Sequence, residues 1–318
     1  MNLRKNEFES IKNLVTNAPD IVEHLVLDTV RYKGKSYDIH SISIGKKDPS
    51  VPVFGIFGGV HGLEQVGAHV VIAYLNHLIE QLKWDRTLVD FFQNVRLVSI
   101  PIVNPVGLVH LKRSNGNGVD LMRNAPIDSH EKVVPLVGGH YWGSFLPWYR
   151  GSKTKMEKEA EVLCNFVKRE VLSSDHAVTI DFHSGFGFKD RLWYPYACST
   201  KSFKEIDKVS QLSDLLDKTI PHHIYRVEPQ SDHYTTHGDL WDFLYFHKKD
   251  NFPEKTFIPL TLEMGSWIWL KKNPMQIFSR LGLFNPIKDH RFDRAMRRHF
   301  LMIDFFLKAT ANPQSWKV

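Results

Sequence analysis

The sequence predicts an α/β fold in which helices flank a central sheet. Four short apolar runs suit buried strands, and they alternate with stretches in which apolar residues recur at helical spacing. No internal repeat, low-complexity segment or glycine/serine-rich linker divides the 318 residues, so a single domain is expected.

The first expected element is a helix over residues 8–27, where apolar residues begin at three-to-four spacing. Alternating polar and apolar residues then predict a strand at 37–44. The remaining expected elements are buried strands at 51–57, 95–103, 176–182 and 257–263, and helices at 64–82, 159–171 and 291–307. Two loop-rich stretches, 124–154 and 190–240, are the expected places for a binding surface.

The composition excludes several classes of protein. With 42% hydrophobic and 24% charged residues, the chain matches a globular protein and not a disordered, collagen-like or coiled-coil one. Its two cysteines, Cys164 and Cys198, are too few for a disulfide framework. No apolar segment follows the charged N-terminus, and no window approaches a membrane span, so we expect a cytoplasmic protein that has no signal peptide and no membrane partner.

The basic residues exceed the acidic ones by six. The densest basic cluster, Arg291, Arg294, Arg297 and Arg298, alternates with apolar residues at helical spacing, which indicates a helix with a solvated basic face. No nucleic-acid-binding motif accompanies it, so no nucleic-acid partner is expected. Phosphate-loop, dinucleotide and serine-hydrolase signatures are incomplete in this sequence as well.

A histidine and a carboxylate lie at one strand-to-helix turn. His61 and Glu64 follow the strand at 51–57 and can converge on one ion, because α/β proteins place ligand sites where strands end. A second pair with the same spacing, His77 and Glu80, lies in mid-helix, where a solvated pair is the plain interpretation. The context therefore favours the first pair as metal ligands.

His183 is the best candidate for a third ligand, because it also lies at the end of a buried strand. Asp181 precedes it by two residues and points to the same side of that strand, so it can support the histidine. Two histidines, one carboxylate and a fourth position left open for water form a donor set typical of catalytic zinc.

Two further features suit hydrolysis. Glu263 ends the strand at 257–263, and a carboxylate in such a place needs a partner or a chemical task, such as accepting a proton from water. The stretch from Lys112 to Arg123 follows another buried strand and contains guanidinium groups that could stabilise an oxyanion or hold a substrate carboxylate.

With these motifs the sequence resembles the zinc carboxypeptidase family, including its bacterial peptidase and deacylase relatives. The matching segments occur in family order over most of the chain: Gly59–Glu64, Asn104–Gly107, Arg113–Asn115, Gly118–Asn124, Asp181–Ser184 and Thr261–Glu263. The resemblance implies a single α/β domain over residues 1–318, with a mixed, mostly parallel sheet of about eight strands. We expect its core at about 36–310 and an N-terminal helical extension at 1–30.

The resemblance also implies roles for the metal site and the base. His61, Glu64 and His183 would bind one zinc ion per chain. Glu263 would act as general base toward the zinc-activated water and then as general acid toward the leaving group.

Further roles implied by the resemblance concern the substrate. Arg113 would polarise the scissile carbonyl and stabilise the oxyanion, and Arg123 would hold the terminal carboxylate. Asn124 completes the motif that contains Arg123 and is expected to bind substrate with it. Tyr234 fits the mobile tyrosine that caps the substrate, although Tyr225 and Tyr245 are nearby.

The sequence departs from the family pattern at Met122, where the family usually has asparagine beside the carboxylate-binding arginine, and at Val106, where it has aspartate. We expect a zinc-dependent hydrolase that cleaves an amide or peptide bond near a substrate carboxylate. The alternative is a zinc-dependent deacylase of N-acyl amino acids, of the succinylglutamate desuccinylase and aspartoacylase type. A non-catalytic binding protein on the same fold is a third interpretation. The sequence predicts neither the side-chain preference nor the oligomeric state.

Overall fold

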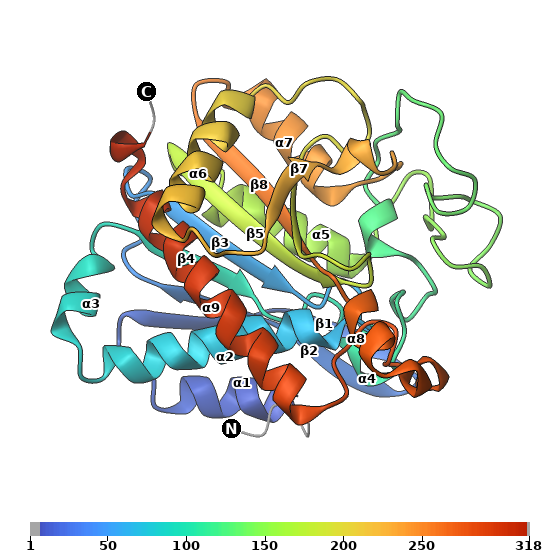
Figure 1. Cartoon of the computed structure of the whole chain (residues 1–318), viewed down its shortest axis with the longest axis horizontal. Coiled ribbons are helices and arrows are strands. Elements are labelled where there is room, and N and C mark those ends of the chain that lie inside the picture. The colour runs from blue at the N-terminus through green and yellow to red at the C-terminus, as the bar shows by residue number, and fades with distance from the viewer. Residues whose placement is uncertain (1–6, 317–318) are drawn as a thin grey trace.

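One eight-stranded sheet runs through the molecule, with strand order β1-β2-β4-β3-β5-β8-β6-β7 (Figure 1). The structure is a computed structural model that describes residues 7–316. Adjacent strands are parallel across β4-β3-β5-β8 and between β6 and β7, and antiparallel at the other junctions. The strands are β1 Val22–Tyr32, β2 Lys35–Ile44, β3 Val53–Gly58, β4 Arg96–Ile100, β5 His176–Ser184, β6 Arg191–Tyr194, β7 Arg226–Pro229 and β8 Thr256–Met264. The predicted mixed, mostly parallel α/β sheet is confirmed.

Helices cover both faces of this sheet (Figure 1). They are α1 Glu7–Thr16, α2 Gln65–Leu82, α3 Arg86–Phe91, α4 Pro105–Val109, α5 Lys158–Glu170, α6 Ile206–Thr219, α7 Leu240–Asn251, α8 Trp267–Lys272 and α9 Asp289–Ala311, with short 3₁₀ helices at Leu121–Arg123, Gln230–Asp232, Pro274–Phe278 and Pro313–Ser315. Helices α2 and α9 contact each other and strands β3 and β5, whereas α5 and α7 contact each other on the opposite face. Within residues 7–316, none of these helices has both the length and the apolar character needed to cross a membrane.

The centre of the sheet forms the core. Strands β3, β4 and β5 are buried along their whole length, which is expected of parallel strands with helices on both faces. Phe57 of β3, for example, packs against Phe166 of α5 and Trp241 of α7. Cys164 and Cys198 are both buried and unpaired, in agreement with the expected lack of a disulfide framework.

The predicted helix at 8–27 is wrong in its second half. Helix α1 ends at Thr16, and residues 22–32 form β1, the edge strand that pairs with β2. Pro19 disfavours continuation of the helix. The turn at Lys33 and Gly34 has positive φ at both residues, as a two-residue hairpin requires. Residues 17–30 of the expected helical extension are therefore not helical, and residues 1–6 of that segment lie outside the described residues.

The two stretches expected to be loops differ from each other. Residues 124–154 contain no helix or regular strand, in agreement with the prediction. Residues 190–240, in contrast, contain β6, α6, β7 and a 3₁₀ helix, so this stretch has more regular structure than predicted. It still supplies residues to the cavity described below, namely Trp193, Gln230, Tyr234 and Asp239. Strands β6 and β7 have four residues each, which is too short for a periodic pattern to reveal.

Candidate metal centre and active site

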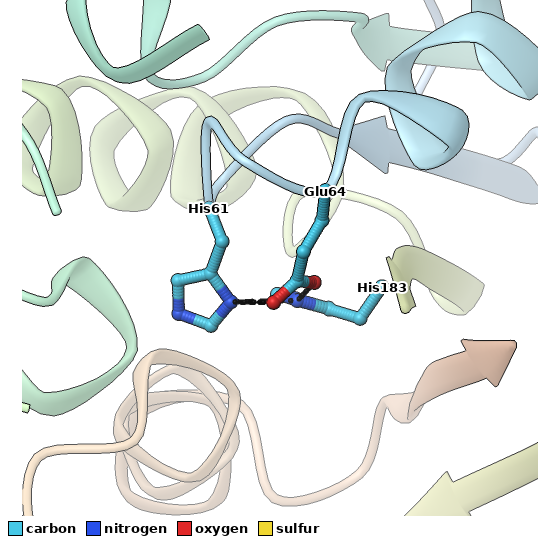
Figure 2. A group of neighbouring side chains, drawn as sticks. All are labelled: His61, Glu64 and His183. Atoms are coloured by element: carbon cyan, nitrogen blue, oxygen red, sulfur yellow. Dashed lines mark hydrogen bonds and ion pairs between the residues drawn. The ribbon is translucent and has the colours of Figure 1, made fainter. Parts of the chain in front are cut away.

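Three residues predicted as metal ligands converge at the C-terminal ends of β3 and β5. His61 and Glu64 lie in the loop between β3 and α2, and His183 is the penultimate residue of β5 (Figure 2). Glu64 Oε1 is 2.9 Å from His61 Nδ1, Glu64 Oε2 is 3.0 Å from His183 Nδ1, and the two Nδ1 atoms are 3.1 Å apart. All three side chains are buried. These residues could together hold one metal ion.

The loop between β3 and α2 packs closely against helix α4. A Cβ atom on Gly62 would lie 1.9 Å from the carbonyl carbon of Gly107 in α4, so no other residue fits there. The glycine thus allows His61 to turn inward while the loop packs on α4.

The orientation of the two imidazoles suits metal binding. His61 Nε2 lies 2.9 Å from Asp120 Oδ1, and His183 Nε2 lies 2.8 Å from Asp181 Oδ2. An ionised carboxylate only accepts hydrogen bonds, so Nε2 of each ring donates to its aspartate. Nδ1 of each ring faces Glu64 and the other histidine, and is the atom left to bind a metal ion. Two imidazole nitrogens and one carboxylate are the donors of a catalytic zinc site, so the residues fit zinc.

Charge around the ligands is balanced by neighbouring groups. Burial opposes ionisation of Glu64, but the nearby His61 and His183 lower the pKa of this carboxyl. Burial lowers the pKa of His183, yet Asp181 and Glu64 together raise this pKa well above its usual value. A metal ion bound at Nδ1 of His183 would have to displace a proton, so we expect metal affinity to rise with pH.

Asp181 is itself held in place. Its Oδ2 also accepts a hydrogen bond of 3.0 Å from the indole of Trp241, which is buried in α7. The expected support of His183 by Asp181 is confirmed, and Trp241 extends this chain of contacts to the helix layer.

Arg113 lies beside the ligand cluster. Its guanidinium donates to Glu64 Oε1 at 2.8 Å and to Asp120 Oδ2 at 3.0 Å, while a quarter of the side chain remains exposed. Burial lowers the pKa of Arg113, but Asp120 and Glu64 raise it above its ordinary value, so the group stays charged. A permanent positive charge thus lines the site.

Glu263 lies on the strand next to the one that carries His183. Strands β5 and β8 are parallel, and His183 is directly opposite Glu263 in their register. Oε2 of Glu263 is buried and has no hydrogen-bond partner among residues 7–316. Burial, followed by the charge of Glu64, raises the pKa of Glu263 to about 8. An unpartnered carboxyl with a raised pKa is typical of a group that exchanges protons.

A small cavity of about 20 Å³, roughly the room for one water molecule, joins these groups. It is lined by His61, Arg113, Met122, Arg123, His183, Trp193, Gln230, Tyr234, Asp239, Thr261 and Glu263. The cavity therefore brings together all the predicted site residues except Asn124 and Glu64, and the carboxylate of Glu64 contacts both histidines that line it.

The sequence model that describes the zinc carboxypeptidases matches residues 8–268. The chain belongs to the zinc carboxypeptidase family. This family uses zinc, and the His-Glu-His cluster fits one metal ion.

Individual zinc carboxypeptidases resemble the chain to different extents. It is 24% identical to carboxypeptidase SOL1 of Arabidopsis thaliana over 249 residues, which cover 74% of the chain and 45% of SOL1. The chain thus spans less than half the length of the curated relatives that it matches. Thrombin-activatable fibrinolysis inhibitor has the same fold, with a TM-score of 0.72 at 15% identity over 96% of this chain and 73% of that one. Carboxypeptidase A of Helicoverpa armigera aligns with a TM-score of 0.67 at 17% identity over 95% and 71% of the two chains.

Backbone contacts join the loop that carries Arg123 to the loop that carries Tyr234. Ala125 N donates to Gly238 O, and a Cβ atom on Gly238 would lie 2.0 Å from Arg123 O, so only glycine permits the approach. Arg123 is buried and donates to the carbonyl groups of Met122 and Val137. Burial raises the pKa of Tyr234, so its phenol is neutral near pH 7.

Asn124 does not face the cavity. Its amide donates to Arg150 O at 2.8 Å and accepts from Glu157 N at 2.6 Å, so both ends of the side chain hold backbone segments together. The structure thus places it behind the substrate-facing surface.

The sequence did not assign a role to Asp120, which holds His61 and Arg113, or to Asp239, a buried carboxylate in the cavity wall. Asp239 also caps α7 by accepting from the amides of Trp241 and Asp242. A usable signal existed only for Asp120, which lies in the segment Gly118–Asn124 that matches the family.

Proposed function

We propose that this zinc carboxypeptidase-like hydrolase cleaves an amide or peptide bond next to a substrate carboxylate, with Glu263 as the group that moves protons. The observation that carries the proposal is the unpartnered Oε2 of Glu263, in a cavity that it shares with two metal-ligating histidines and two arginines. A buried carboxyl oxygen without a partner costs free energy of folding, which a catalytic task explains.

Each residue of the site has a separate role in the proposed hydrolysis. Zinc, when bound by His61, Glu64 and His183, supplies Lewis acidity and lowers the pKa of water. Glu263 accepts a proton from the attacking water and later donates it to the leaving nitrogen. Arg113 donates hydrogen bonds to the oxyanion that forms on the carbonyl carbon.

Two further groups bind the substrate in this proposal. The guanidinium of Arg123 pairs with the substrate carboxylate, and burial of this group strengthens the attraction. The neutral phenol of Tyr234 covers the bound substrate from the opposite loop.

Replacing Glu263 by glutamine tests the central role. Glu263→Gln should lower kcat by about 10²–10⁴-fold, because an amide cannot accept the proton. Zinc content should stay at that of the unmodified chain, since Glu263 is not a ligand. The matched control is Glu254→Gln, which changes an exposed glutamate in the turn before β8. A Glu263→Gln enzyme that binds zinc and turns over at nearly the original rate would disprove the role of Glu263.

Met122 favours a second candidate function, the deacylation of N-acyl amino acids. Its thioether lines the cavity beside Arg123, where asparagine would add a hydrogen-bond donor for a C-terminal carboxylate. Comparing kcat/KM for a panel of peptides with that for N-acyl amino acids separates the two functions. Preference for the small acyl substrates would support deacylation and reject peptide hydrolysis as the main activity.

A further inference from the structure

A second, larger pocket lies beside the active site and shares none of its lining residues. It has a volume of about 490 Å³ and is bordered by α8, α9, the loop after β5 and the start of β7. Its lining residues are Phe188, Lys189, Asp190, Ile224, Arg226, Gly265, Ile268, Trp269, Lys272, Arg291, Arg294, Ala295, Arg298 and His299. The proposed hydrolysis uses none of them.

Cationic side chains dominate this pocket. Six lysines and arginines line it, against the single carboxylate of Asp190. That carboxylate is already engaged, because it accepts from Gly265 N at 2.9 Å and pairs with Arg298 at 3.2 Å. Burial lowers the pKa of His299 to about 4, so this ring adds no charge near pH 7.

Two of the six cations have structural partners and four do not. Arg298 pairs with Asp190, and Arg291 donates to the carbonyl groups of Trp269 and Lys272, which fixes the end of α8 on α9. The other four are Lys189, Arg226, Lys272 and Arg294, whose side chains have no hydrogen-bond or ion-pair partner in the part of the chain that the structure describes.

The four unpartnered cations come from separate elements. Arg294 shares one face of α9 with Arg291 and Arg298, at helical spacing, and Lys272 ends α8. Lys189 and Arg226 lie on the sheet side, where Arg226 N also bonds to Asp190 O. Like charges gathered around one concave pocket repel one another, and an anion in the pocket would relieve that repulsion.

We propose that this pocket binds a ligand that carries two or more phosphate groups. One phosphate carries about −1.5 to −2 charges near pH 7, which is less than the cations around the pocket can neutralise. The guanidinium groups of Arg226 and Arg294 offer the planar pairs of donors that match phosphate oxygens. The apolar wall of Ile224, Ile268 and Trp269 gives room for the part of the ligand that carries the phosphates.

The basic helix face predicted from the sequence thus forms part of the proposed phosphate-binding pocket. Arg291, Arg294 and Arg298 line the pocket, whereas Arg297 of the same cluster does not and is exposed. This inference does not depend on the proposed hydrolysis.

Titration calorimetry with inorganic pyrophosphate on the zinc-loaded protein tests the inference. The unmodified chain should bind pyrophosphate, and raising the ionic strength should weaken the binding because salt screens the attraction. Arg226→Gln and Arg294→Gln should each raise Kd by roughly tenfold, the loss expected for one charge-assisted pair. Arg297→Gln is the matched control and should bind like the unmodified chain. Chelation of the metal by pyrophosphate is equal in all four proteins, so the difference between variants is the decisive result.

A second arm distinguishes the source of the phosphates. Vesicles of phosphatidylcholine, with or without the diphosphate lipid cardiolipin, are sedimented with each protein. Binding that needs both cardiolipin and Arg294 assigns the pocket to a lipid headgroup, and pyrophosphate binding without vesicle binding assigns it to a soluble ligand. Equal pyrophosphate affinity in the unmodified chain, Arg226→Gln and Arg294→Gln would overturn the proposal. Failure of the unmodified chain to bind either pyrophosphate or cardiolipin vesicles would also overturn it.

Discussion

Replacing Asp120 by asparagine would test how a carboxylate outside the ligand set controls the metal centre. Asp120 is 1% exposed and accepts three hydrogen bonds. Its Oδ1 accepts from His61 Nε2 and from Met122 N, at 2.9 and 3.0 Å, and its Oδ2 accepts from Arg113 Nε at 3.0 Å. Burial opposes ionisation, but Arg113 and His61 hold the pKa of Asp120 well below its usual range, so the group is charged at neutral pH.

The three hydrogen bonds of Asp120 determine how much zinc affinity Asp120→Asn should lose. Asparagine offers one oxygen and an NH₂ group, so it must direct a donor either at the guanidinium of Arg113 or at His61 and Met122. Loss of such an outer partner lowers metal affinity by about 10–100-fold, which corresponds to roughly 1.4–2.7 kcal/mol. Because Arg113 loses one of its two charged partners in either orientation, kcat/KM should fall even when zinc is saturating.

The assay is competition for zinc between the protein and a chromogenic chelator at fixed pH, followed by kinetics with zinc in excess. Asp214→Asn is a suitable control, because Asp214 is exposed on α6 and far from the ligand set in the sequence. A zinc Kd for Asp120→Asn within twofold of the original value would refute the reasoning. An equal loss in Asp214→Asn would show that the effect is not specific to the site.

Two other expectations follow from single residues. His299 is buried with its pKa lowered to about 4, compared with 6.5 when unfolded, so the unfolded chain binds more protons between these values. The free energy of unfolding should therefore fall by up to about 3 kcal/mol as the pH drops from 6.5 to 4. Urea denaturation across this range should show the fall, and His299→Gln, which can still accept from Tyr225, should flatten that part of the profile; an unchanged slope would contradict the assignment. Met122→Asn should raise kcat/KM for peptides with a free C-terminal carboxylate about tenfold, by one added hydrogen bond to a charged group. Unchanged kinetics with C-terminally amidated and free peptides alike would argue against a carboxylate at that position.

Much of the fold could be predicted because its centre is apolar on both faces. Strand β3 is a continuous apolar run in the sequence, β5 and β8 contain shorter apolar runs, and helices α2 and α9 show apolar stripes. The edges could not be predicted in this way. Strand β1 is half-exposed, and β6 and β7 are short, so tertiary pairing decides their structure and not local periodicity.

The site also contains residues that the strand pattern locates and residues that only tertiary packing locates. His61, Glu64, His183 and Glu263 are next to or within buried strands, so their position in the sequence places them at one end of the sheet. Asp120 and Asp239 lie outside the strands, and their proximity to the metal ligands and to the cavity depends on how loops pack. No local pattern contains that information. Asn124 shows the converse error, because a motif residue can support the backbone without facing the substrate.

The parallel register of β5 and β8 has a consequence for how such an enzyme can change. His183 and Glu263 are neighbours because two strand backbones are paired, so their separation does not depend on the intervening chain. Insertions or deletions between residues 185 and 255 can therefore reshape the substrate-facing loops while the ligand and the carboxyl keep their spacing. A one-residue slip within either strand, in contrast, would turn one of the two side chains to the other face of the sheet. The chain between these two strands can thus change in length while His183 and Glu263 keep their positions relative to each other.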